Sequence, residues 1–106
     1  KIELLGVDPE TLATWGAVSE PAAREMVLGA LRASYADVAA AVTGIAGPDG
    51  GSVDKPVGLV WFAWCVRGRA ARIESRRFEG DRAAIRRQAI ETALQGLIEA
   101  LDHPLG

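Results

Sequence analysis

The sequence predicts an α/β domain of three layers, α/β/α, in which helices cover both faces of a mixed sheet. Two apolar stretches are typical of buried strands, a third stretch alternates charged and apolar residues, and helical periodicity recurs before and after them. The 106 residues are enough for one domain with one modest core. We therefore expect residues 1–106 to form a single domain.

The N-terminal third predicts two helices. Asp8 followed by Pro9 is typical of a helix cap with proline at the first helical position, and this short helix should end near Gly16. Ser19 is expected to cap the second helix. Its apolar residues recur at three- and four-residue spacing, which predicts one face packed on the sheet: Ala23, Met26, Val27, Ala30 and Leu31.

The middle of the chain predicts the sheet. Residues 38–42 are too short a run for a helix between their neighbours and are predicted to be a strand. Residues 57–66 are apolar on both alternating faces, so this strand should be central and covered on both sides. Gly68 indicates a tight turn into a half-exposed strand over residues 70–78, where arginine and glutamate alternate with smaller residues.

A long C-terminal helix is predicted to begin at Gly80 and Asp81 and to end before Pro104. The apolar stripe expected to face the core is Ile85, Ala89, Ala93, Leu94, Leu97, Ile98 and Leu101. Three strands make a thin sheet, and the chain begins on Lys1 without a starting methionine. We therefore expect that the N-terminal part of the domain, including part of its sheet, is missing from this sequence.

Charge and composition limit the kinds of partner. The net charge is −2, yet residues 67–87 carry eight arginines against three acidic residues. A solvated strand and helix face is the favoured interpretation of this block, and an anionic small molecule is the next; no aromatic residues interleave with it as in a dedicated nucleic-acid binder. No apolar run is long enough to span a membrane and no signal peptide is visible, so we expect a soluble, cytoplasmic protein without a membrane partner.

The single cysteine and single histidine offer little chemistry. Together they cannot form an internal disulfide or a zinc site, so no metal is expected. Cys65 lies mid-strand among aromatic residues, where a thiol is usually buried, protonated and inert. His103, beside Pro104 in the tail, is expected to be a solvated terminal residue rather than part of a catalytic triad.

The most informative stretch is the glycine-rich loop at residues 43–52, between two predicted strands. Glycines adopt positive φ and let backbone N–H groups approach a ligand, so such a loop can cradle an anion or an oxyanion. Its four glycines are Gly44, Gly47, Gly50 and Gly51. The loop lacks the Gly-Lys-Ser/Thr ending of a P-loop, and no helix opens directly from it as in a dinucleotide fingerprint. A plain wide connection is the alternative interpretation.

The loop and its flanks closely resemble the signature of the C-terminal domain of CinA-type competence/damage-inducible proteins, the nicotinamide-nucleotide amidases. The matching residues are 43–48, 50–52, 55–58 and 60–61, and residues 4–7, 16–20 and 80–82 also stand where that family has them. The resemblance covers almost the whole chain.

This resemblance implies hydrolysis of the carboxamide of nicotinamide mononucleotide to nicotinate mononucleotide and ammonia, without a metal or other cofactor. In that family the nucleophile is a serine in a segment that would lie upstream of residue 1, assisted by a tyrosine and by a lysine at the position of Lys1. The 106 residues lack the serine segment and are expected to be inactive alone. The alternative is a catalytically silent nucleotide-binding or regulatory module of a longer CinA-type protein.

The resemblance also implies the substrate-binding residues. The Thr43 hydroxyl would bind the substrate or the nucleophile loop, the segment that carries the serine. The alternative is that Thr43 is a β-branched residue at a strand end that caps the turn. Arg82 stands at a helix start, where a cation opposes the helix dipole, so the phosphate of a nucleotide substrate would compensate it; a solvated arginine beside Asp81 is the other interpretation. The thin sheet also favours a homodimer or larger homo-oligomer.

Overall fold

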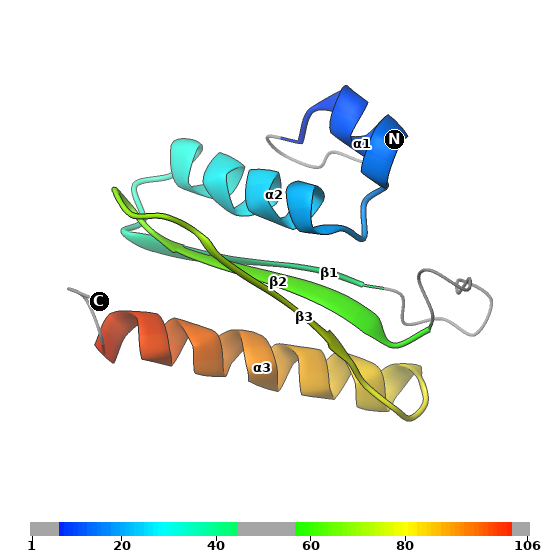
Figure 1. The fold of residues 1–106 in the computed structure, drawn as a ribbon. Helices are drawn as coiled ribbons and strands as arrows, with labels where there is room; N and C mark the ends of the chain where they lie inside the picture. The colour runs from blue at the N-terminus through cyan, green and yellow to red at the C-terminus, as the bar shows by residue number, and fades with distance from the viewer. Residues whose placement is uncertain (1–6, 45–56, 103–106) are drawn as a thin grey trace.

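The computed structural model describes residues 7–44 and 57–102. Helices α1 and α2 lie over one face of the sheet and α3 over the other (Figure 1), which confirms the α/β class and the three layers. The elements in chain order are α1 (Pro9–Trp15), α2 (Glu20–Arg32), β1 (Val38–Gly44), β2 (Leu59–Val66), β3 (Arg72–Arg77) and α3 (Arg82–Asp102).

The three described strands form a sheet of order β1-β2-β3 in which both pairs are antiparallel. The prediction of a mixed sheet is therefore wrong for the described strands. A parallel pair needs a crossover from one end of the sheet to the other. Here β1 ends where β2 begins, and the turn at Gly68, with φ of 86°, reverses the chain directly into β3.

The predicted helix boundaries are confirmed by their caps. The Asp8 carboxylate accepts a hydrogen bond from the Glu10 N–H at 2.8 Å, and Gly16 ends α1 with φ of 80°. Ser19 accepts from the Ala22 N–H and donates to the Gly16 carbonyl, so one hydroxyl joins the end of α1 to the start of α2. Such caps satisfy backbone groups that the first turn leaves without partners.

Strand β2 is central, as predicted, and is buried on both faces. Phe62 and Trp64 face α3, where they pack with Ile85 and Ala89. Ala63 and Cys65 face the opposite layer and pack with residues of α2. Burial raises the pKa of the Cys65 thiol, which agrees with the inert role expected for it.

Trp64 fixes α3 to the sheet. Its indole stacks on the Phe62 ring with the centroids 5.6 Å apart, and its Nε1–H donates to the Ala93 carbonyl at 3.0 Å. The indole lies directly against Gly96, where the Cβ atom of any other residue would overlap the ring. Gly96 is thus a position in α3 where the packing excludes a side chain.

The apolar stripe of α3 is only partly buried. Ile85, Ala89, Ala93 and Leu97 contact the core as expected. The prediction is wrong for Leu94, Ile98 and Leu101, which are 54%, 52% and 62% exposed. The apolar residues of α3 cover a wider part of the helix circumference than the part that contacts β1 and β2. The side chains beyond that contact are therefore exposed.

We expect Gly96→Ala to destabilise the fold by about 1–3 kcal/mol, because the new methyl group would displace the Trp64 indole. On an unconstrained helix the same change stabilises by about 1 kcal/mol, so the sign is diagnostic. Urea unfolding measures it, with the exposed neighbour Gln95→Ala as a control expected within about 0.5 kcal/mol of wild type. Equal or higher stability of Gly96→Ala would contradict the packing described for Trp64.

Candidate functional site

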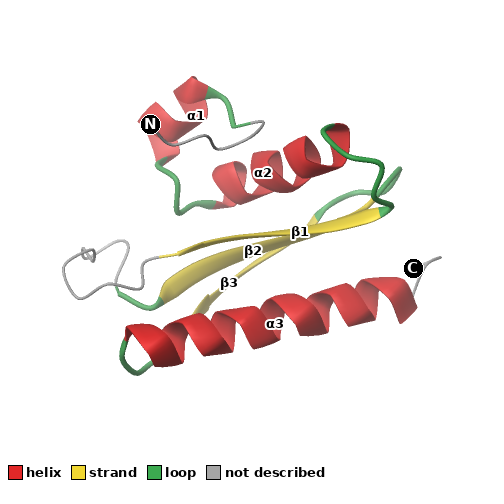
Figure 2. Cartoon of the chain, turned by 180° about the vertical axis from the view of Figure 1, so that it is seen from behind, coloured by secondary structure: helices red, strands yellow, loops and turns green. Residues whose placement is uncertain are grey.

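The two flanks of the glycine-rich loop and two helix starts meet at one end of the sheet. Strand β1 ends there, β2 begins there, and both views place the first residues of α2 and α3 at the same end (Figures 1 and 2). We name this region, with Ser19, Thr43, Gly44, Gly58 and Arg82, the loop end of the sheet. The starts of α2 and α3 lie on opposite faces of the sheet. The N-terminal end of each helix carries a partial positive charge, which favours an anion near it.

Thr43 ties β1 to the layer above it. Its hydroxyl donates to the Ala17 carbonyl at 2.9 Å, which connects the end of β1 to the turn between α1 and α2. Gly44 follows at the exposed end of the strand, opposite Val60. A Cβ atom at Gly44 would lie 2.8 Å from Val60 Cγ2, so this position is crowded. The hydrogen bond of Thr43 and the crowding at Gly44 are each a structural explanation for the residue at that position. The contact of both residues with substrate stays a prediction.

Arg82 is the first residue of α3 and its side chain is exposed. The cap is Asp81, whose carboxylate accepts from the Ala84 N–H at 2.8 Å. The first turn of α3 contains no acidic residue. Within residues 7–44 and 57–102 the Arg82 guanidinium makes no hydrogen bond or ion pair. The described part of the chain therefore leaves the donors of the Arg82 guanidinium available for an anionic ligand.

The turn that leads into Arg82 is held against the start of β2. The Phe78 N–H donates to the Gly58 carbonyl at 2.9 Å. Gly58 has φ of 94°, and a Cβ atom there would overlap the Phe78 carbonyl oxygen. Gly80 also has positive φ, at 117°. The glycine of the motif at residues 55–58 thus permits the close approach of two chain segments, one following the glycine-rich loop and one preceding Arg82.

Several predicted site residues lie outside the described residues: Lys1, Gly47, Gly50 and Gly51. His103 lies outside them as well. Their predicted roles stay predictions. Of the predicted substrate-binding residues, the structure describes Thr43, Gly44 and Arg82, all at the loop end of the sheet.

The arginine-rich block at residues 67–87 is partly structural. The Arg67 guanidinium donates to the carbonyls of Leu31, Ser34 and Ala36 at 2.7–3.0 Å, so it caps the C-terminal end of α2. Nothing in the sequence indicated this contact, because its partners are about thirty residues away in the chain. Arg67 is therefore not available to an anionic ligand.

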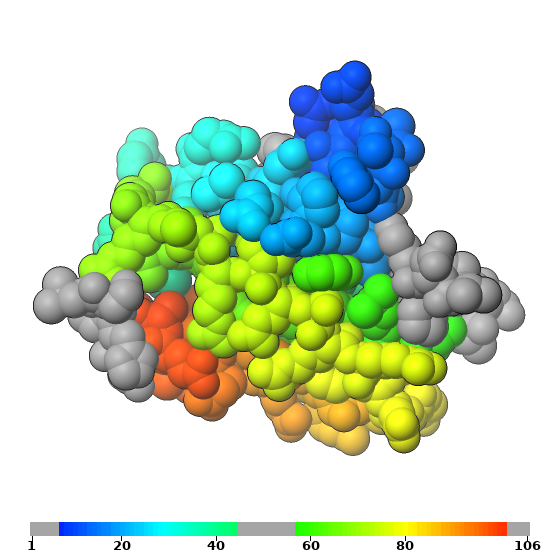
Figure 3. Space-filling view, viewed as in Figure 1, coloured from blue at the N-terminus to red at the C-terminus, as the bar shows by residue number. Residues whose placement is uncertain are grey.

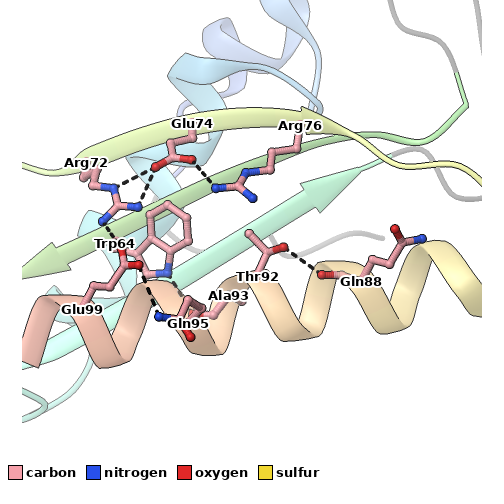
Figure 4. Close-up of polar contacts among 9 residues, drawn as sticks. All are labelled: Trp64, Arg72, Glu74, Arg76, Gln88, Thr92, Ala93, Gln95 and Glu99. Atoms are coloured by element: carbon pink, nitrogen blue, oxygen red, sulfur yellow. Dashed lines mark hydrogen bonds and ion pairs between the residues drawn. The ribbon is translucent and has the colours of Figure 1, made fainter.

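A second polar region lies between β3 and the middle of α3 (Figure 4). It is a groove of about 280 Å³ lined by Trp64, Arg72, Arg76, Glu91, Thr92, Gln95, Gly96 and Glu99. The Arg72 guanidinium lies 4.6 Å from the centre of the Trp64 ring and pairs with Glu74 at 2.6 Å and Glu99 at 3.1 Å. In the space-filling view the side chains of β3 fill the surface between α2 and α3 (Figure 3). The paired charges favour a structural role, in which Arg72 joins β3 to α3.

The charges of this region shift the pKa of its carboxyl groups. The hydrogen bond from Arg72, helped by that from Arg76, holds the pKa of Glu74 below its ordinary value of 4.5, although partial burial acts in the opposite direction. Hydrogen bonds from Gln95 and then Arg72 lower the pKa of Glu99. The described residues hold no group of three or more His, Cys, Asp or Glu side chains that could bind a metal. None of the described helices is both long and apolar enough to cross a membrane.

Comparison with known proteins agrees with this architecture. Residues 1–101 match the family model of the CinA C-terminal domain. The chain belongs to the CinA C-terminal domain family. It is 54% identical over 97 residues to the nicotinamide-nucleotide amidohydrolase PncC of Escherichia coli K12, covering 92% of this chain and 59% of that protein. It is 50% identical to a CinA-like protein of Akkermansia muciniphila, of which it covers 24%.

Solved structures of the CinA family share the fold. The competence/damage inducible protein CihA of Agrobacterium tumefaciens superposes with a TM-score of 0.88 at 48% identity, over 92% of this chain and 59% of that one. ComA of Klebsiella pneumoniae gives 0.87 at 44% identity, over 94% and 62%. The chain thus spans about three-fifths of the length of the PncC protein and of these solved chains.

The depressed pKa of Glu74 predicts a pH-dependent contribution to stability. Because the unfolded carboxyl takes up its proton first, the Arg72–Glu74 pair stabilises the fold fully above about pH 5 and loses this effect as the pH falls through the lowered pKa of the folded state. We expect Glu74→Gln to be less stable than wild type at pH 6 and to approach it at pH 3, as measured by urea unfolding at both pH values.

Glu91→Gln is the matched control, because Glu91 lines the same groove and makes no ion pair with the residues that the structure describes. The difference in the free energy of unfolding between Glu91→Gln and wild type should be the same at the two pH values. If the free energy of unfolding of Glu74→Gln differs from that of wild type by the same amount at both pH values, the Arg72–Glu74 pair does not stabilise the fold.

Proposed function

We propose that this chain is the substrate-binding part of a nicotinamide-nucleotide amidase, which hydrolyses nicotinamide mononucleotide to nicotinate mononucleotide and ammonia. The observation that carries the proposal is that Thr43, the flanks of the glycine-rich loop and Arg82 all lie at one end of the sheet, and that Arg82 has no partner among the described residues. The 54% identity to a protein named nicotinamide-nucleotide amidohydrolase supports the choice of substrate.

In this proposal Arg82 binds the phosphate of the substrate. A guanidinium forms two parallel hydrogen bonds with a phosphate, and the start of α3 adds its partial positive charge. The loop glycines Gly44, Gly47, Gly50 and Gly51 offer backbone N–H groups to the rest of the nucleotide or to the developing oxyanion. Thr43 positions this loop through its bond to Ala17 and contacts the substrate or the nucleophile loop.

The chemistry of the proposal needs a serine from a segment preceding residue 1. As its oxygen attacks the carboxamide carbon, its hydroxyl proton passes to the catalytic base. The C–N bond then breaks, and the base gives this proton to the leaving nitrogen, which departs as ammonia. Water then hydrolyses the acyl-enzyme to the free carboxylate and restores the serine. Lys1 would be the base, which requires that the complete protein lower its pKa by desolvation or by a neighbouring cation.

Arg82→Ala in the full-length protein should raise KM for nicotinamide mononucleotide about ten-fold or more, with a smaller effect on kcat, because a charge-assisted contact to the phosphate is lost. The measurement is ammonia release without added metal. Arg87→Ala is the control, since Arg87 is an exposed arginine of the same helix on a different face, and its KM should stay within about two-fold of wild type.

An unchanged KM for Arg82→Ala would remove the phosphate role of this residue. Absence of ammonia release by a folded full-length wild-type protein would reject the amidase and leave the silent nucleotide-binding module as the better description.

A further inference from the structure

The connection between β3 and α3 places Arg82, and it is held by one side chain that no sequence motif indicated. Gln88 lies six residues, about one and two-thirds turns, along α3 from Arg82 and is partly buried. Its Nε2 group donates to the Glu79 carbonyl at 2.9 Å and to the Ala84 carbonyl at 3.0 Å. The first of these bonds ties α3 to the connection that precedes it.

This connection is held from both sides. On the side of the sheet, the Phe78 N–H donates to the Gly58 carbonyl at 2.9 Å. On the side of the helix, Gln88 holds Glu79 and the cap residue Asp81 holds the first turn. Between these anchors stands Gly80, whose φ of 117° gives the chain a bend that other residues rarely adopt. Residues 78–81 are therefore anchored at each end around a glycine of positive φ.

We propose that Gln88 is a positioning residue for Arg82, a role that rests on the function proposed above. Without the Gln88 amide, the Glu79 carbonyl loses its donor, and on the side of the helix the bend at Gly80 is held only by the Asp81 cap. Arg82 follows this bend by two residues, so its guanidinium would sample more orientations and meet the phosphate less often. Gln88 does not need to touch the substrate for this effect.

Kinetics of the full-length protein test the proposal with Gln88→Met, which keeps the length and helix propensity of the side chain and removes its donor. We expect KM for nicotinamide mononucleotide to rise about three- to ten-fold, with kcat within about two-fold of wild type, as for the loss of one hydrogen bond. Gln95→Met is the matched control, because Gln95 lies on the same helix and bonds only to Glu99 among the described residues. Its KM should be unchanged.

The double variant separates positioning from a general loss of structure. If Gln88 acts through Arg82, then Gln88→Met should add less than about two-fold to the KM of Arg82→Ala. Effects that multiply in full would overturn the proposal, as would a wild-type KM for Gln88→Met when Arg82→Ala is impaired. A wild-type KM for Arg82→Ala would instead reject the phosphate role of Arg82 and, with it, the role of Gln88.

Hydrogen exchange gives a readout that does not depend on activity. The backbone amides of residues 79–82 should exchange about three- to ten-fold faster in Gln88→Met than in Gln95→Met, with the amides of β2 unchanged in both. Equal exchange at residues 79–82 in the two variants would show that Gln88 does not hold the connection and would overturn the proposal, whatever the reaction catalysed.

Discussion

Burial of β2 on both faces is the constraint on which the rest of this structure depends. Phe62 and Trp64 form the core with α3, whereas Ala63 and Cys65 form the core with α2. The neighbouring strands add hydrogen bonds along both edges of β2. The two helical layers contact the same eight-residue strand, so a disturbance of β2 reaches both cores of the domain.

The same strand connects the core to the loop end of the sheet. The carbonyl of Gly58, just before β2, accepts a hydrogen bond from the Phe78 N–H. The connection that follows Phe78 leads to Arg82. On the other side, β1 pairs with β2 up to Gly44, and Thr43 bonds to Ala17 before α2 begins. The candidate substrate-binding residues are thus carried by elements that the buried strand aligns. This arrangement suits a site that must hold a ligand in one orientation.

The features predicted correctly from the sequence are those with local causes. The caps at Asp8 and Ser19 and the turn at Gly68 each depend on residues within a few positions, and the alternation in β2 follows from its own apolar residues. Side-chain contacts that no motif marks were missed, both that of Arg67 with Leu31 at the end of α2, 36 residues away, and that of Gln88 with Glu79, nine residues away. An isolated glycine inside a helical pattern could have indicated the close contact of Gly96 with Trp64. The exposure of Leu94 could not be read from helical periodicity, which gives the apolar arc of a helix but not the width of the sheet that covers it.

The most direct test of the loop end as the substrate-binding region is a crystal structure of the full-length protein with nicotinate mononucleotide. The phosphate should lie within hydrogen-bonding distance of the Arg82 guanidinium at the start of α3, with the ring directed toward Thr43 at the end of β1. A nucleotide bound elsewhere, such as in the groove beside Trp64 and Arg72, would contradict the assignment of this region.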